Sequence, residues 1–124
     1  VLIIEDDASM RNMLEALLVR FDCTVVTAGD GHEGLRLCRS GDGFDVVVTD
    51  IVMPEMDGLE FIRQLCAVCP KIKVLAVSGG GRIGPENYLE IARKFGAHAV
   101  LEKPFETRQL LDTLIYLTAG DAEL

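Results

Sequence analysis

Short apolar runs alternate along this chain with stretches in which apolar residues recur every three or four positions. The periodic stretches predict amphipathic helices, and the short runs between them predict strands. The run within Asp45–Thr49 is apolar without alternation, as expected of a central strand that is covered on both faces. The predicted strands are Val1–Ile4, Cys23–Thr27, Asp45–Thr49, Lys73–Val77 and His98–Leu101. The predicted helices are Ser9–Phe21, His32–Arg39, Gly58–Val68, Pro85–Phe95 and a last one that carries Leu110, Leu111, Leu114, Ile115 and Leu117.

Strands that alternate with helices predict a parallel sheet with helices on both faces, because right-handed crossovers bury both sides. We expect an α/β, flavodoxin-like, doubly wound sheet of five strands in the order 2-1-3-4-5. In such sheets ligands bind beyond the carboxyl ends of the strands, where the strand order reverses. With this order the reversal lies between the first and third strands. We expect one domain over residues 1–119 and a tail over residues 120–124.

Polar residues follow four of the apolar runs. Glu5 and Asp6 come after the first, Asp50 after the third, Ser78 after the fourth and Lys103 after the fifth. Parallel strands bring these side chains to one edge of the sheet. Carboxylate oxygens are the ligands that Mg²⁺ prefers, and an ammonium group neutralises phosphoryl oxygens. The pattern therefore predicts a magnesium and phosphoryl-group site.

Composition limits the class of protein. The 124 residues suffice for one domain, and 49% hydrophobic with 26% charged residues is a globular balance. No apolar stretch approaches the ~18–20 residues that cross a bilayer, and no leader precedes the first strand, so we expect a cytoplasmic protein without membrane contact. The chain begins inside a strand without an initiator Met, and we expect an excised domain or the ordered part of a longer chain. A net charge of −8 repels nucleic acid phosphates, which argues against direct nucleic acid binding.

The cysteines indicate neither zinc binding nor redox catalysis. Cys66 and Cys69 have the C-x-x-C spacing, but the absence of a second such pair disfavours structural zinc. The pair falls where a helix ends before Pro70, and the helix dipole there disfavours thiolates. We expect Cys23, Cys38, Cys66 and Cys69 to be reduced and mostly buried.

Four motifs follow the predicted strands in order. They are the acidic pair Glu5-Asp6, the segment D-x-x-M-P-x-M-D-G at Asp50–Gly58, S-G at Ser78 and K-P-F at Lys103–Phe105. With these motifs the chain resembles, from Val1 to about Leu117, the receiver domain of bacterial two-component response regulators. The resemblance implies a signalling phosphoacceptor rather than a classical enzyme. Its partners are implied to be a histidine kinase or histidine phosphotransfer protein and an unknown downstream effector.

The resemblance also assigns roles. Asp50 is implied to be the phosphoacceptor and, with Asp6, a direct ligand of Mg²⁺. Glu5 is implied to bind the metal through water, and Val52 through its main-chain carbonyl. Lys103 neutralises one phosphoryl oxygen in this assignment.

We also have expectations for three further residues near the site and for the two histidines. By the same resemblance Ser78 donates a hydrogen bond to another phosphoryl oxygen, and Pro104 follows a cis peptide bond. Asp7, a third consecutive acid, is expected to be exposed or to cap a helix. His32 and His98 lie away from the acidic edge and are expected to be surface or boundary residues.

The chain departs from the family pattern at two places. Val100 stands where the family commonly has an aromatic residue whose rotation reports phosphorylation, and valine is too stiff and small for that role. The segment after Ser78 is a few residues longer than usual and contains Gly79–Gly84. Because glycines ease backbone rearrangement, this loop is a second candidate for the switch.

Three other functions remain as alternatives. A magnesium-dependent phosphohydrolase that uses an aspartyl phosphate needs a second Asp two residues after the nucleophile, where this chain has Val52. A flavin mononucleotide module needs a phosphate loop after the first strand, where Glu5 and Asp6 repel phosphate. A receiver that acts only as a phosphorylation-independent docking domain remains open because of Val100.

Overall fold

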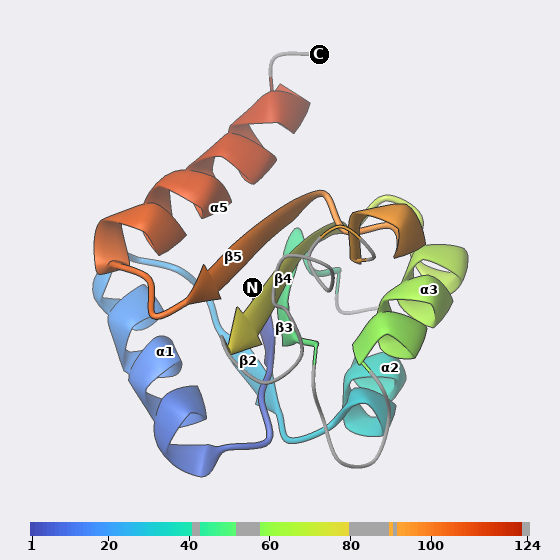
Figure 1. The fold of residues 1–124 in the computed structure, drawn as a ribbon, viewed down its shortest axis with the longest axis horizontal. Coiled ribbons are helices and arrows are strands. Elements are labelled where there is room, and N and C mark those ends of the chain that lie inside the picture. Colours follow the sequence, from blue (N-terminus) through green and yellow to red (C-terminus); the bar gives the residue numbers. More distant parts are fainter. Residues whose placement is uncertain (41–42, 52–57, 80–89, 91, 123–124) are drawn as a thin grey trace.

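The computed structural model describes residues 1–40, 43–51, 58–79, 90 and 92–122. Its strands are β1 (Leu2–Ile4), β2 (Val26–Ala28), β3 (Val46–Asp50), β4 (Lys73–Gly79) and β5 (Ala99–Lys103). The labelled helices are α1 (Ala8–Arg20), α2 (Gly31–Arg39), α3 (Gly58–Val68) and α5 (Thr107–Ala122), as Figure 1 shows. All strand pairs are parallel and the order is β2-β1-β3-β4-β5, which confirms the predicted fold.

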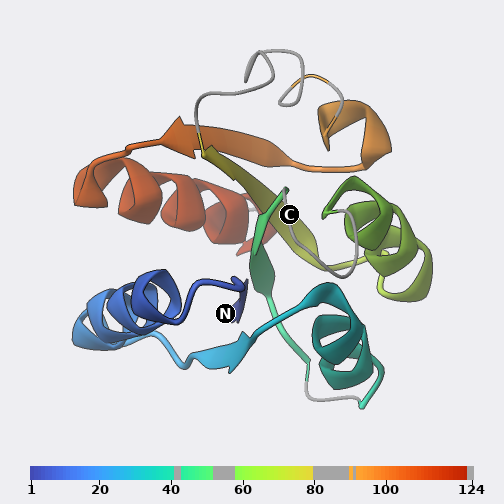
Figure 2. The same cartoon turned by 60° about the horizontal axis from the view of Figure 1, so that its bottom comes forward.

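Helices cover both faces of the sheet. Figure 2 shows α1 and α5 on one face and α2 and α3 on the other. Successive side chains of a strand point to opposite faces, so Val46 and Val48 of β3 pack with α1 and α5, whereas Val47 packs with α2 and α3. All three valines are buried. The apolar run without alternation therefore marks the central strand.

Aspartates begin the first two helices. Asp7 accepts hydrogen bonds from the backbone N–H groups of Ser9 at 2.8 Å and Met10 at 3.2 Å. Asp30 accepts one from Glu33 N–H at 2.9 Å. Each bond satisfies a backbone donor that the helix itself leaves unpaired. Asp7 is thus the exposed helix cap that the sequence predicted.

The predicted second strand starts too early. Residues 23–25 are not part of β2, because β1 begins only at Leu2, which pairs with Val26. The chain before Val26 is still leaving α1: Asp22 has a positive φ of 64°, and Cys23 N–H donates to the carbonyl of Leu18 at 3.1 Å. The Val1 ammonium donates to the Thr24 carbonyl at 2.8 Å, but the parallel ladder begins only with the pair Leu2 and Val26.

The last two strands end later than predicted. β4 and β5 continue to Gly79 and Lys103, which are opposite each other in the register. The pairing of β4 with β5 therefore places Lys103 at the same edge of the sheet as the end of β3. Most of the predicted helix Pro85–Phe95 lies outside the described residues, and residues 92–95 are helical as expected.

Further expectations concern the cysteines and membranes. The four cysteines are free, with Cys38 buried and the other three half-buried. None of the described helices has the length and apolar character of a membrane span.

We predict that Gly34→Ala destabilises the domain. A Cβ at this position in α2 meets Ile4 Cδ1 at 2.5 Å and two ring carbons of Phe61 at 3.2 and 3.3 Å. Both neighbours are buried and cannot swing away. An alanine in a helix is otherwise favourable, so the expected loss of about 1–3 kcal/mol in the free energy of unfolding measures the clash.

Gly29→Ala is the matched control, because its Cβ meets only Arg11 Nη1 at 3.7 Å, an ordinary contact. Urea unfolding of both variants measures the difference. Equal stability of the two variants would show that the sheet and α3 yield to the added methyl group.

Candidate functional site

The polar residues at the strand ends converge as the topology requires. Thr49 of β3 is opposite Ile4 of β1, so Asp50 and Glu5 leave neighbouring strands side by side. Lys103, the last residue of β5, approaches from two strands away across the end of β4. The peptide bond from Lys103 to Pro104 is cis, as expected.

Lys103 bridges two carboxylates. Its Nζ donates to Glu5 Oε1 at 3.1 Å and to Asp50 Oδ2 at 3.2 Å. The side chains of Lys103, Glu5 and Asp50 are only 19%, 5% and 11% exposed. Charges that are this buried need paired partners, and each of the three has one here.

Asp6 completes an acidic cluster. One oxygen each of Glu5, Asp6 and Asp50 lie within 4.8 Å of one another. Glu5 is buried, Asp50 half-buried and Asp6 exposed, so the cluster opens to solvent on the Asp6 side. Three carboxylates against one ammonium leave negative charge uncompensated. An oxygen-only, anionic and partly open donor set fits the preferences of Mg²⁺.

The charges of the cluster shift two pKa values. Burial raises the pKa of Glu5 above its ordinary value of 4.5, and the charge of Asp50 raises it further, while Lys103 acts in the opposite direction. Burial pushes the pKa of Lys103 down, but the carboxylates of Asp50 and Glu5 outweigh it, so the pKa lies above 10.5. Lys103 therefore carries its charge throughout the physiological range.

Supporting residues that the sequence reasoning missed hold the cluster in place. Arg11 Nη1 donates to the carbonyl oxygen of Glu5 at 2.9 Å, and Asp7 N–H donates to Glu5 Oε2 at 3.3 Å. The buried Thr49 donates from Oγ1 to the Asp50 carbonyl at 3.0 Å. Its position in the predicted helix could have identified Arg11. It comes four residues after the cap Asp7, and a long side chain at that position turns back toward the end of β1.

Other predicted site positions are only partly described. Ser78 is in β4 opposite Glu102, but its side chain lies outside the described residues. Val52 and residues 80–84 of the glycine-rich loop also lie outside them. Val100 is in the middle of β5 and packs against the core on the α2 and α3 side.

Both histidines lie away from the cluster. His32 is exposed in the first turn of α2. His98 is exposed before β5 and accepts a hydrogen bond at Nδ1 from Val74 N–H at 3.0 Å. It therefore belongs to the other end of the β4–β5 ladder.

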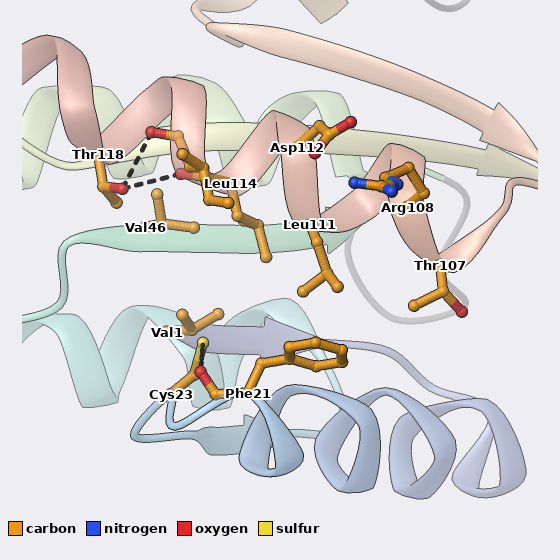
Figure 3. Close-up of a pocket in the computed structure, with 11 residues that line it drawn as sticks. Val1, Phe21, Cys23, Val46, Thr107, Arg108, Leu111, Asp112, Leu114 and Thr118 are labelled. Carbon is orange, nitrogen blue, oxygen red and sulfur yellow. Dashed lines mark hydrogen bonds between the residues drawn. The ribbon is translucent and has the colours of Figure 1, made fainter.

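A cavity of about 670 Å³ lies elsewhere, between the end of α1 and α5. Figure 3 shows Phe21 after α1 across the cavity from Leu111 of α5, with Val46 and Leu114 deeper in. Arg108 and Asp112 lie at its rim in the same view. None of its lining residues belongs to the acidic cluster.

We predict that Glu5→Gln becomes progressively more stable relative to the parent as pH rises above 4.5 in the absence of divalent cations. A raised pKa in the folded state means that Glu5 adds stability at low pH, and that this stability is lost as pH rises through the folded pKa. Glutamine does not ionise and avoids that loss. Urea unfolding in chelator across pH 4–8 measures the difference, and a difference that shrinks with pH contradicts the prediction.

Comparisons with known proteins agree with this geometry. Residues 1–115 match the family described as the response regulator receiver domain. The chain is 34% identical over 116 residues to the chemotaxis protein CheY of Listeria monocytogenes, covering 92% of this chain and 93% of that protein. It is 37% identical over 115 residues to the sensor kinase CckA of Brucella abortus, covering 92% of this chain but only 12% of the kinase. The transcription factor SKN7 of Chaetomium thermophilum is 34% identical, and the chain spans 15% of its length.

Solved structures have the same fold. A response regulator receiver domain protein from Clostridium thermocellum superposes with a TM-score of 0.89 at 27% identity, covering 98% of this chain and 94% of that one. A CheY-like receiver domain protein from Methanospirillum hungatei superposes with a TM-score of 0.87 at 25% identity, covering 99% and 96%. These matches, together with the strand-end motifs and the sheet order, show that the chain belongs to the family of response regulator receiver domains.

Proposed function

We propose that this chain is the phosphoacceptor switch of a two-component phosphorelay, with Asp50 as the acceptor. The observation that carries the proposal is the position of Lys103 Nζ, 3.1 Å from Glu5 Oε1 and 3.2 Å from Asp50 Oδ2, beside an acidic cluster that suits Mg²⁺. This combination of a nucleophile, a fixed cation and a metal site is what phosphoryl transfer requires.

Asp50 attacks the phosphorus of a phosphohistidine on a histidine kinase or histidine phosphotransfer protein. The bond from its carboxylate oxygen to phosphorus forms as the phosphorus–nitrogen bond breaks, and the imidazole takes up a proton. The product is an aspartyl phosphate. Lys103 faces both the carboxylate and the incoming oxygens, so it lowers the repulsion between two anions. The same groups assist the later hydrolysis.

Mg²⁺ would be held by Asp6 and Asp50 directly and by Glu5 through water; the main-chain carbonyl of Val52, which lies outside the described residues, would be the further ligand. When bound, Mg²⁺ supplies positive charge that offsets the phosphoryl oxygens. Glu5 accepts hydrogen bonds from both Lys103 and the backbone of Asp7, which keeps its carboxylate oriented toward the cluster.

Ser78 reports the phosphoryl group in this proposal. The end of β4 is between the ends of β3 and β5 in the sheet. Ser78 lies between Val77, which is opposite Asp50, and Gly79, which is opposite Lys103. Its hydroxyl donates to a phosphoryl oxygen. Because Val100 stands in place of the usual aromatic residue, the glycine-rich segment after Ser78, of which residues 80–84 lie outside the described residues, remains the second candidate for the switch.

The partner surface includes α1 in this proposal. Receiver domains pair with histidine kinases and effector domains, and the sensor kinase CckA and the transcription factor SKN7 are among the relatives. Met13 on α1 is 55% exposed, although it is apolar. It lines, together with Lys103 and Phe105, a cavity of about 610 Å³ next to the acceptor. An apolar rim beside the acceptor suits a docking helix that presents a histidine.

We predict that Mg²⁺ stabilises the domain and that Asp6→Asn weakens this effect. Ligand binding to the folded state at ten times the dissociation constant adds about 1.4 kcal/mol to the free energy of unfolding. Asp7→Asn is the matched control, because it removes the same charge one residue away and asparagine caps a helix as well as aspartate does. Thermal unfolding across a Mg²⁺ titration measures both. Equal weakening in the two variants would mean that general charge, not ligation, governs binding.

We predict that acetyl phosphate adds one phosphoryl group to the parent in a Mg²⁺-dependent manner, and adds none to Asp50→Asn. Intact-mass spectrometry measures the adduct, and Asp7→Asn, which keeps every proposed site residue, should be labelled like the parent. Absence of an adduct in the parent, together with absence of beryllofluoride binding, would overturn the proposal in favour of a phosphorylation-independent docking domain.

A further inference from the structure

Two thiols meet at the end of the sheet opposite the acidic cluster. Cys38 is in the last turn of α2, and Cys69 follows directly after α3. These two helices pack side by side on one face of the sheet (Figure 2). Cys69 Sγ is 3.7 Å from the carbonyl oxygen of Cys38, to which it donates a hydrogen bond. Cysteines 31 positions apart in the sequence are therefore adjacent in the fold.

Cys38 and Cys69 also line the same cavity. Burial raises the pKa of Cys38 to about 11, and the charge and hydrogen bonding of the Cys69 thiol contribute to that rise. Both side chains pack against the core cluster between the sheet, α2 and α3. The backbone holds Cys69 firmly, since its N–H donates to Leu65 at 2.7 Å and its carbonyl accepts from Ile72 at 3.2 Å.

A cavity gives small molecules access to this pair. It has a volume of about 520 Å³ and is lined by both thiols together with Phe44, Pro70 and Lys71. Cys69 is half-buried, whereas Cys38 is only 8% exposed. The Cys69 thiol is therefore the one that a small oxidant reaches first.

We propose that Cys38 and Cys69 form a modification site that a hydroperoxide oxidises to an intramolecular disulfide between the ends of α2 and α3. The Cys69 sulfur attacks one peroxide oxygen, the O–O bond breaks, and a sulfenic acid and one water, or one alcohol, result. The Cys38 sulfur then attacks the Cys69 sulfur, the S–S bond forms, and the sulfenic oxygen leaves as water. Two thiols and one hydrogen peroxide thus give one disulfide and two waters.

The environment of the two thiols sets the rate of disulfide formation and the rate of disulfide reduction. Few Cys38 thiols are ionised near neutral pH, because burial raises the pKa of this thiol to about 11. Formation is therefore slow. Reduction is slow as well, because a thiol of high pKa is a poor leaving group from a disulfide. The site records sustained oxidation rather than a brief pulse.

The C-x-x-C motif does not determine which thiol pairs with Cys69. Cys66 Sγ donates to the carbonyl oxygen of Gly96 at 3.7 Å, so this thiol is directed toward the turn before β5. Cys69 Sγ is directed toward Cys38. The fold therefore pairs Cys69 with a distant residue rather than with the cysteine three positions before it.

Oxidation of the full chain with hydrogen peroxide tests the proposal. After the peroxide is removed, the protein is denatured and alkylated with N-ethylmaleimide, and its mass gives the number of free thiols. We expect the reduced chain to take up four alkyl groups and the oxidised chain two, with a Cys38–Cys69 link in the peptide map. We also expect the bridge to raise the melting temperature by about 10 °C, an increase that dithiothreitol reverses.

Variants separate this pairing from its competitors. Cys66→Ser and Cys23→Ser should still lose two alkylation sites, whereas Cys69→Ser and Cys38→Ser should form no internal bridge. Thermal unfolding under reducing conditions checks that each variant folds. If Cys38→Ser does not fold, Cys69→Ser, which changes a half-buried residue, still tests the proposal. A Cys66–Cys69 link, a bridge only between molecules, or a parent that keeps four alkylation sites would each overturn the proposal.

Discussion

The central strand β3 has no side that faces water, and this constraint organises the molecule. It pairs with β1 on one edge and β4 on the other, and helices cover both of its faces. All its backbone groups therefore need partners in neighbouring strands, and its side chains need apolar partners above and below. Only its carboxyl end, at Asp50, leaves the covered region. The reactive group of the proposed switch is thus placed by the burial of the four residues before it.

Uncompensated charge at that end follows from the same constraint. The ends of β1 and β3 are adjacent, so their carboxylates cannot separate, and Lys103 on β5 neutralises only part of the charge. Burial of Glu5 increases the cost of this arrangement, as its raised pKa indicates. A cation or a phosphoryl group changes the charge balance of the cluster. A site that is short of positive charge in this way favours a bound cation, whereas a phosphoryl group adds further negative charge to it.

The two ends of the sheet differ in chemistry because they differ in construction. At the carboxyl end, the strand ends gather charged side chains into a largely buried cluster that opens to solvent at Asp6. At the amino end, the last turn of α2 and the residue after α3 place the thiols Cys38 and Cys69 against the core. The first end suits reversible phosphoryl chemistry, and the second suits thiol chemistry that does not disturb it.

Local patterns in the sequence determined the element types, the strand order and the candidate edge. Periodicity placed α3 at Gly58–Val68, and the caps Asp7 and Asp30 precede helices because a short acidic side chain satisfies free N–H groups. Element ends were less predictable. The start of β2 depends on where β1 begins, and the end of β5 depends on how far β4 extends, which no local pattern contains.

Contacts between distant residues were decided only by the tertiary structure. The sequence placed Glu5, Asp50 and Lys103 after apolar runs that predict strands, but the bridge of Lys103 between both carboxylates depends on the register of four strands. The C-x-x-C spacing drew attention to Cys66, whereas the packing of α2 against α3 brought Cys69 to Cys38. Spacing along the chain reports neighbours within one element. Neighbours across elements depend on how the helices and strands pack, because burial of apolar surface acts on the whole fold.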